Sequence, residues 1–269
     1  MKESTQLYMM KDWELPEYKI IEFRPKRSKY CVCIPVINEG DRIKKQLIKM
    51  QEIAKYYDII IADGDSNDGS LNHSILKKLN IRTLLIKKGP GKLSAQLRMG
   101  YAYAIKQGYN GIVTIDGNNK DNVDAIPNFI KELESGYDFI QGSRYLPGGK
   151  GINTPLIRLI ATKLIHIPII SLLAGFKYTD TTNGYRGYSI KFLLSERVQP
   201  FRNIFNTYEL LAYLSVKAPR LGFKVKEIPV IRAYPSKGKK PTKISFFRGN
   251  FDLLRILFNL IIGKYNIKK

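Results

Sequence analysis

The chain of 269 residues has very few of the residues that build covalent or zinc-bound frameworks: two cysteines and two histidines. Cys31 and Cys33 lie two positions apart in a run that predicts a buried strand, so both side chains face the same way, which is a poor geometry for a disulfide. No cluster of His and Cys has the spacing of a zinc site. We therefore expect two core thiols in a reducing cytosol.

Long uncharged apolar runs are also missing. The most apolar stretches, 156–176 and 251–263, are interrupted by charged residues. Neither supplies the roughly 18 uncharged residues that a membrane span needs. Residues 1–19 carry charges throughout and lack the apolar core of a signal peptide. The sequence predicts neither export nor an integral membrane protein.

Acidic residues are scarce, with 23 Asp and Glu against 45 Lys and Arg and a formal net charge of +22. This balance favours anionic partners. Against that background, Asp63, Asp65 and Asp116 each follow an apolar run that predicts a strand. Such carboxylates lie in the crevice where open α/β sheets bind ligands. They would repel a nucleic-acid backbone, so we expect no nucleic acid but a divalent cation that holds a diphosphate.

From residue 29 to residue 141, short apolar runs alternate with segments of helical periodicity. This alternation predicts βαβ units and a mostly parallel sheet. After Gly142 the pattern changes to polar, glycine-bearing loops, an apolar helical region at 156–173 that we expect to break near Pro168, and one more helix and strand. We predict an α/β, Rossmann-like fold with amphipathic helical appendages. The predicted division is an N-terminal extension (1–28), the main domain (29–234), and a basic linker with a C-terminal amphipathic helix (235–269).

Seven segments in order resemble the inverting family 2 glycosyltransferases of GT-A fold, and most closely the polyprenol-phosphate sugar synthases such as dolichol-phosphate mannose synthase. The resemblance covers roughly residues 30–245. It is carried by CVCIPVINEG, IIIADGDSNDGS, KKGPGKLSAQLRMGYAYA, VTIDGNNKD, FIQGSRYLPGGK, DTTNGYRGYS and KEIPVIRAYPSKGKKPTKIS.

The resemblance implies a donor site made of several short motifs. Lys92 and Arg98 bracket the start of a helix after a glycine loop whose composition is typical of phosphate cradles. Asp180 is the candidate general base if the acceptor is a hydroxyl. In the family, phosphates of donor and acceptor are held at the positions of Arg144, Arg186 and Lys243. The base and ribose pocket falls on Pro35, Asn38, Glu39, Asp63 and Asp65.

Asp116 matches the first acidic residue of the family's Asp-x-Asp metal site, which implies Mg²⁺ or Mn²⁺ as cofactor. Two departures stand beside it, because the second Asp is Asn118 and a position often filled by Gln is Lys120. An amide offers a carbonyl oxygen without charge, so the site should bind metal more weakly. Either Asp121 compensates as a further ligand, or the Lys120 ammonium partly replaces the cation.

The implied reaction is attack by an acceptor oxygen on the anomeric carbon of a nucleotide sugar. The resemblance favours a polyprenyl phosphate acceptor, with the protein cytoplasmic and peripheral on the inner face of the cell membrane. Two alternatives remain, namely transfer to a sugar hydroxyl of a growing cell-surface polysaccharide, and a basic nucleic-acid-binding protein. The two apolar stretches would lie on an anionic membrane surface, or would instead pack on the sheet or on a second subunit of a homo-oligomer.

Overall fold

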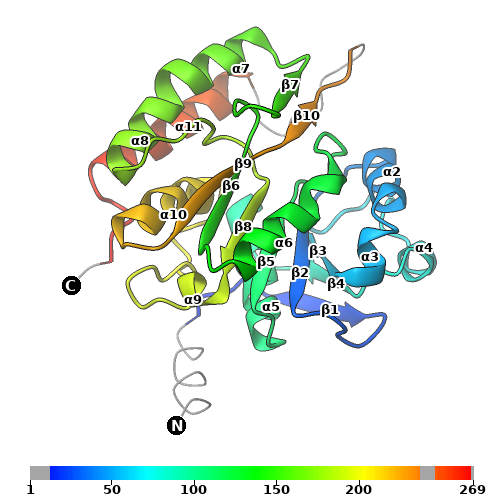
Figure 1. The fold of residues 1–269 in the computed structure, drawn as a ribbon. Coiled ribbons are helices and arrows are strands. Elements are labelled where there is room, and N and C mark those ends of the chain that lie inside the picture. The colour runs from blue at the N-terminus through cyan, green and yellow to red at the C-terminus, as the bar shows by residue number, and fades with distance from the viewer. Residues whose placement is uncertain (1–12, 237–245, 268–269) are drawn as a thin grey trace.

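The computed structural model describes residues 13–236 and 246–267 and is built on an eight-stranded sheet (Figure 1). The strand order is β1-β4-β3-β2-β5-β8-β6-β9. The strands are β1 (Tyr18–Glu22), β2 (Tyr30–Val36), β3 (Asp58–Asp63), β4 (Thr83–Lys87), β5 (Gly111–Thr114), β6 (Phe139–Ser143), β8 (Arg186–Ser189) and β9 (Val225–Pro229).

The sheet is mostly parallel, as the alternating pattern predicts. Strands β1 and β8 run against the others, because β1 pairs antiparallel with β4, and β8 pairs antiparallel with both β5 and β6. Strand β1 belongs to the stretch expected as an N-terminal extension. Strand β8 corrects the expectation of a polar loop, since its backbone fills the gap between β5 and β6 although its sequence, RGYS, has no apolar alternation.

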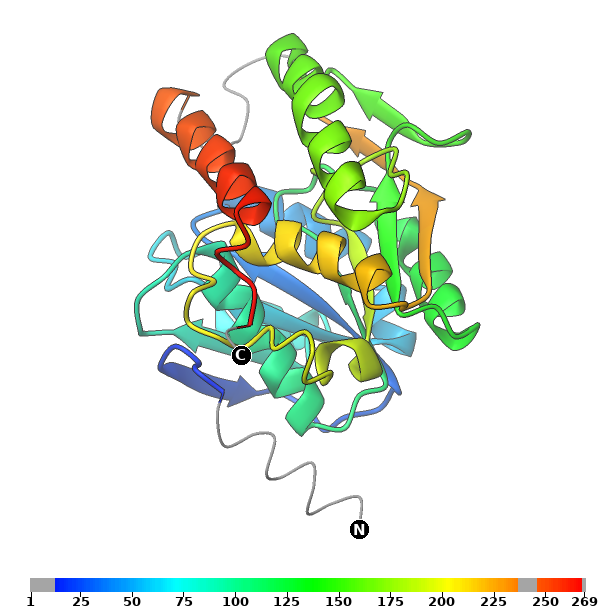
Figure 2. The ribbon, with the colours of Figure 1, turned by 90° about the vertical axis from the view of Figure 1, so that its left-hand side faces the viewer.

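Helices cover both faces of the sheet because the strands are apolar on both sides. In β3, Ile60 and Ala62 face one core, while Ile59 and Ile61 face the other. The first core is closed by α5 (Leu93–Lys106), α9 (Ile190–Leu193) and α10 (Glu209–Arg220) (Figure 2). The second is closed by α2 (Asp41–Lys49), α3 (Ile53–Tyr56), α4 (His73–Lys78), η1 (Val123–Ala125) and α6 (Ile126–Glu134).

A further helical layer packs outside α10. It consists of α7 (Leu156–Ala161), η2 (Thr162–His166) and α8 (Ile167–Ala174), which follow one another without a gap, and of α11 (Phe246–Ile261) beside them (Figure 2). The expected break near Pro168 does not occur. Instead η2 is a π-helical turn just before Pro168, which places the residue without an N–H near the start of α8.

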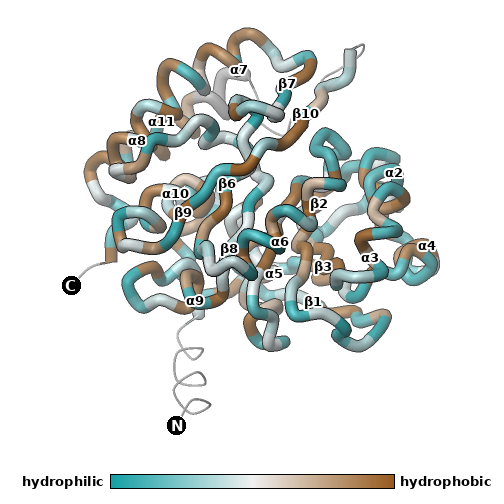
Figure 3. The backbone as a smooth tube through the Cα atoms, in the orientation of Figure 1, coloured by the Kyte–Doolittle hydropathy of each residue, from teal (hydrophilic) through white to brown (hydrophobic). Residues whose placement is uncertain are grey.

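The continuous helix Leu156–Ala174 tests the prediction that neither apolar stretch is long enough to span a membrane. By length and composition, Leu156–Ala174 could cross a membrane, which corrects the expectation that neither apolar stretch reaches that length. Few of its side chains are buried, so it is not a core helix of the domain. Figure 3 shows its apolar colouring, together with that of α11. A short two-stranded sheet, β7 (Lys150–Ile152) with β10 (Ile231–Ala233), lies beside this layer.

Candidate functional site

The loops after β2 and β3 are joined to each other by side chains. The Asn38 N–H donates to Ser66 Oγ at 2.9 Å, and the Asn67 N–H donates to Asn38 Oδ1 at 2.9 Å. Asp68 accepts from the Gly40 N–H at 2.7 Å and from the Ser70 N–H, so it serves as a turn residue. The predicted residues Asn38, Glu39, Asp63 and Asp65 are thereby brought to one edge of the sheet, beside Pro35 at the end of β2.

Asp63 is the more deeply buried of two buried carboxylates in this loop pair, at 3% exposure against 8% for Glu39. It accepts from the N–H and the hydroxyl of Ser66, and burial raises its pKa. Glu39 accepts from Arg42 at 2.8 Å. Asp65 is exposed, has a positive φ of 75° and pairs with Lys88 at 2.7 Å. Of these carboxylates, Asp63 has the environment that most resembles a binding group, because it is desolvated and held in place.

Asp116 lies just beyond β5, next to β2 in the sheet. The Gly117 N–H donates to the Pro35 carbonyl at 3.3 Å, which ties the Asp116 turn to the first predicted motif. A Cβ added at Gly184 would lie 2.7 Å from Asp116 Oδ1. The carboxylate therefore needs glycine at position 184. Its side chain is 24% exposed, so it can be reached from outside.

Arg232, in β10, pairs with both predicted carboxylates of this turn. Its Nη2 lies 2.8 Å from Asp116 Oδ2, and its Nη1 donates to Asp121 Oδ2. The Arg232 side chain is 6% exposed and that of Asp121 is 0% exposed. We call Asp116, Asn118, Lys120, Asp121 and Arg232 the carboxylate corner.

Burial and charge act against each other in the carboxylate corner. Burial opposes ionisation of Asp116, but Arg232 and Lys120 outweigh it and leave the pKa of Asp116 lowered. Burial raises the pKa of Asp121 in spite of Arg232. For Lys120, burial and then Arg232 lower the pKa to about 8. The two carboxylates outweigh burial at Arg232 and raise its pKa well above the ordinary value.

The predicted metal ligands do not form a ready divalent-cation site. The formal charges of Asp116, Asp121, Lys120 and Arg232 sum to zero, whereas hard divalent cations prefer sites with an excess of anionic oxygens. Among the described residues, no group of three or more His, Cys, Asp and Glu is placed to hold a metal ion. Asn118 Nδ2 donates to Asp116 Oδ2 at 3.3 Å. Asn118 Oδ1 and Asp121 Oδ1 are buried and have no hydrogen-bond partner among the described residues.

Tyr234 connects the carboxylate corner to the outer helical layer. Lys120 Nζ lies 4.8 Å from the centroid of the Tyr234 ring. The Tyr234 hydroxyl accepts a hydrogen bond from Arg158 of α7 at 3.0 Å. Burial would raise the pKa of Tyr234, but Arg232, Arg158 and Lys120 outweigh it and lower that pKa. Positive charge is thus concentrated between the corner and α7.

Arg144 and Asp180 form a separate buried pair. Arg144 Nε and Nη2 contact Asp180 Oδ2 and Oδ1 at 2.7 and 2.9 Å. Burial opposes the charge of Asp180, but the hydrogen bonds from Arg144 outweigh it and lower its pKa. Glu227 in turn accepts from the backbone N–H groups of Thr179 and Asp180. Asp180 is 0% exposed and a weak base, which weighs against the predicted role of general base there.

Two predicted phosphate-binding arginines make hydrogen bonds within the fold. All three side-chain nitrogens of Arg186 donate to backbone carbonyls, those of Thr181, Asn183 and Leu211. Arg98 is buried and donates to the Glu14 carbonyl and to Asn206 Oδ1. These bonds hold both guanidinium groups within the fold, although Arg98 Nε is buried without a hydrogen-bond partner among the described residues. Their roles in phosphate binding stay predictions.

Of the two remaining predicted cations, Lys92 and Lys243, only Lys92 lies among the described residues. Lys92 is exposed just before α5, and its backbone N–H donates to the Asn206 carbonyl at 2.7 Å. Lys243 lies outside the described residues.

The residues that the sequence interpretation missed are Arg232, Tyr234 and Arg158. For Arg232 there was one signal, a lone arginine in the apolar run VIRAY.

This arrangement of sheet and helices matches solved glycosyltransferase structures. One is the glucosyl-3-phosphoglycerate synthase of Mycobacterium tuberculosis, crystallised with Mn²⁺, UDP and phosphoglyceric acid, with a TM-score of 0.58 and 16% identity over 87% of this chain and 76% of that one. A likeness at this identity shows the fold, and it confirms the predicted class, a GT-A Rossmann-like α/β fold.

The chain belongs to glycosyl transferase family 2, whose model matches residues 31–195. It is 24% identical to the undecaprenyl-phosphate mannosyltransferase of Micrococcus luteus, over 73% of this chain and 80% of that protein. It is 25% identical to the polyprenol monophosphomannose synthase of Mycolicibacterium smegmatis, over 74% and 75%. These relatives confirm the predicted family.

Proposed function

We propose that this enzyme transfers a sugar from a nucleoside-diphosphate donor to a polyprenyl phosphate at a membrane surface. The observation that carries the proposal is the continuity between the carboxylate corner and the outer helix. Asp116 pairs with Arg232, Lys120 lies over Tyr234, and Tyr234 is bonded to Arg158 of α7. A lipid phosphate at that helix would therefore lie beside a cluster of positive charges that extends to the donor site.

On the donor side, Asp63 is placed to accept from ring N–H groups of a base, while the corner receives the diphosphate. Negative charge grows on the diphosphate as the sugar leaves. Fixed cations aimed at that charge stabilise the transition state because they need not reorganise during the reaction. Arg232 and Lys120 are the cations of the corner, and Arg158 is linked to it through Tyr234.

On the acceptor side, the structure favours an oxygen nucleophile that is already ionised. Asp180, the candidate base, has both oxygens engaged by Arg144 and Thr182 and a lowered pKa. A sugar hydroxyl would need a base to take its proton. A phosphate monoester is ionised at neutral pH and needs none. Transfer to a polysaccharide hydroxyl is therefore the weaker alternative.

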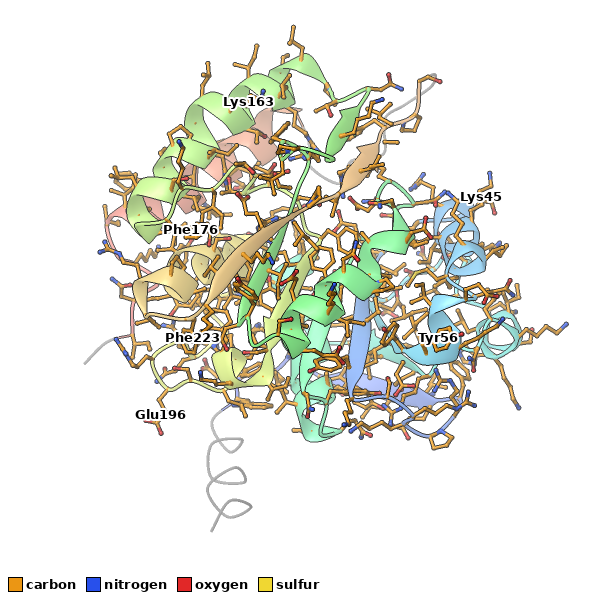
Figure 4. All side chains as sticks on the ribbon, viewed as in Figure 1. Lys45, Tyr56, Lys163, Phe176, Glu196 and Phe223 are labelled. Carbon is orange, nitrogen blue, oxygen red and sulfur yellow. The ribbon has the colours of Figure 1, made fainter. Side chains whose placement is uncertain are left out.

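The outer layer supplies the proposed membrane contact. Its exposed apolar side chains, together called the apolar face, include Leu164 at 72%, Leu172 at 83% and Phe258 at 58% exposure. Lys163 stands among them on η2, where Figure 4 labels it. An apolar helical face flanked by cations lies in the plane of an anionic membrane surface. The apolar face comprises Leu156, Ile157, Ile160, Leu164, Ile165, Leu172, Phe251, Leu254, Phe258, Ile261 and Ile262.

We expect the apolar face to determine binding to anionic liposomes. Leu172→Glu and Phe258→Glu should each weaken flotation with the vesicles about tenfold or more, because burying one such side chain is worth about 1.5–3 kcal/mol. The matched control is Ile48→Glu, which removes an apolar side chain that is 56% exposed on α2. Equal losses in all three variants would contradict the assignment, and self-association instead of flotation would assign the face to a second subunit.

We expect a divalent cation to reach the corner only together with the nucleoside-diphosphate donor. Because the corner is charge-balanced, binding of the diphosphate does not require Mg²⁺ or Mn²⁺. An ion that arrived with the diphosphate would be held by Asn118 Oδ1 and Asp121 Oδ1, two buried oxygens of the corner without a hydrogen-bond partner among the described residues. The ion would supply positive charge for the leaving group.

The proposed reaction is tested with a panel of UDP- and GDP-sugars. The purified chain should show thermal stabilisation by one nucleotide class and should transfer radiolabel to added polyprenyl phosphate. The product should extract into organic solvent and release its sugar in mild acid. Label that stays in the aqueous phase on an added glycan would replace the lipid acceptor by the polysaccharide alternative.

A further inference from the structure

The charge of the carboxylate corner is set by the chain's own side chains. Three cations converge on the Tyr234 ring, with Lys120 Nζ at 4.8 Å, Arg158 Cζ at 5.8 Å and Arg232 Cζ at 5.9 Å from its centroid. The two carboxylates of the corner, Asp116 and Asp121, are both paired with Arg232. The cluster as a whole therefore carries one net positive charge before any ligand arrives.

Two residues of the corner account for this balance. A carboxylate in place of the Asn118 amide would remove one unit of positive charge, and a neutral amide in place of Lys120 would remove another. Together these changes equal the charge of one divalent ion. In their present form, Asn118 and Lys120 give the corner the charge that a bound metal would otherwise bring.

The position of Arg232 supports the same conclusion. Its two terminal nitrogens bind Asp121 and Asp116, the two carboxylates of the corner that would otherwise be available to a cation. A guanidinium presents planar, paired donors that also fit phosphate oxygens. Asp116 is the more accessible partner, at 24% exposure against 6% for Arg232. A diphosphate that approaches Asp116 therefore meets the arginine directly behind it.

We propose that Arg232 and Lys120 neutralise the donor's diphosphate, so that this chain binds a nucleoside diphosphate without a divalent ion. The inference rests on the proposed function and specifies how its donor site is charged. Arg232 and Lys120 are 5% and 6% exposed, so both act on the diphosphate mainly through their charge.

The test is calorimetric titration of UDP and of GDP, each in EDTA and in Mn²⁺. For the unaltered protein, the Kd of the preferred nucleotide should change less than about threefold between the two conditions. The double variant Asn118→Asp with Lys120→Gln should bind about ten- to hundredfold more weakly in EDTA, because the cluster then carries two fewer positive charges to offset those of the diphosphate. Mn²⁺ should restore its affinity.

A matched control keeps the total charge of the double variant and moves one change away from the site. Asn118→Asp with Lys106→Gln removes an exposed lysine at the end of α5 that precedes β5, at the opposite edge of the sheet from Asp116. It should lose clearly less affinity in EDTA than the double variant does. Equal losses would show that Lys120 has no local role and would overturn the proposal.

Binding of Mn²⁺ alone gives a second measurement that does not depend on the variants. By electron paramagnetic resonance, the unaltered protein without nucleotide should leave Mn²⁺ free, and the double variant should bind it. Tight Mn²⁺ binding by the unaltered protein, or a nucleotide affinity that falls tenfold or more in EDTA, would overturn the inference and leave the proposed function in place. Failure of both nucleotides to bind in either condition would overturn the proposed function itself.

Discussion

Two of the buried arginine–carboxylate clusters among the described residues differ in how completely their polar atoms are hydrogen-bonded. In the first, both oxygens of Asp180 accept hydrogen bonds, and the Arg144 side chain is 2% exposed. In the second, Arg232 holds Asp116 and Asp121, yet Asp121 Oδ1 has no hydrogen-bond partner among the described residues and Asp116 remains partly exposed.

The difference separates a structural pair from a binding site. A satisfied, fully buried pair has no capacity left for a ligand, and its charges are locked by their mutual bonds. A pair with unsatisfied oxygens and an exposed edge can exchange its internal bonds for bonds to an incoming anion or cation. Charge alone does not make this distinction, because both clusters contain a buried arginine.

The largest expected effect is on stability, at the satisfied pair. Asp180→Ala leaves the Arg144 charge buried without its partner, so the free energy of unfolding should fall by about 3–5 kcal/mol. Chemical denaturation measures it. If Asp116→Ala, at the partly exposed pair, destabilises the protein as much as Asp180→Ala does, the distinction between a structural pair and a binding site is contradicted.

The next effect concerns position rather than charge. Gly184→Ala introduces a Cβ that would lie 2.7 Å from Asp116 Oδ1, so the carboxylate or the loop must shift. A misplacement of about 1 Å at a reacting site can cost up to about 10²-fold in rate. We expect a loss of about tenfold or more in the rate of sugar transfer, with the denaturation midpoint nearly unchanged. Normal transfer by this variant would show that the position of Asp116 is not critical.

The smallest effect is a pH dependence from Asp63. Burial raises the pKa of this carboxyl, so it loses its charge at a higher pH than an ordinary aspartate as the solution is acidified. If the ionised form accepts from the nucleotide base, donor affinity should weaken on the acid side, and Asp63→Asn should remove that dependence. Titrations of nucleotide across mildly acidic pH measure it. An unchanged acid limb in Asp63→Asn would exclude Asp63 from the base pocket.

Much of the fold could be predicted because its signals are local. Runs such as DIIIA give a strand that is buried on both faces, and the 3.6-residue periodicity after each run gives the covering helix. Strand β8 could not be predicted in this way. Its four residues contain a glycine and an arginine, and the two flanking strands alone decide its conformation.

The site was predictable on its acidic side and much less so on its basic side. Asp63 and Asp116 stand directly after strands, so the topology brings them to one edge. Arg232 lies 116 positions from Asp116, and the sequence does not show that the two side chains meet. The sequence does not show the partners of Arg186 either, because they are backbone carbonyls.

The most direct test of the account is sugar transfer to polyprenyl phosphate by the unaltered protein and by Asp116→Ala, measured as label extracted into organic solvent. The account predicts labelled lipid from the unaltered protein and a rate lower by about 10² to 10³ in the variant, because the diphosphate loses a group that orders its cations. The variant should keep its cooperative unfolding. Near-full transfer by Asp116→Ala would contradict the central claim that chemistry takes place at this carboxylate corner.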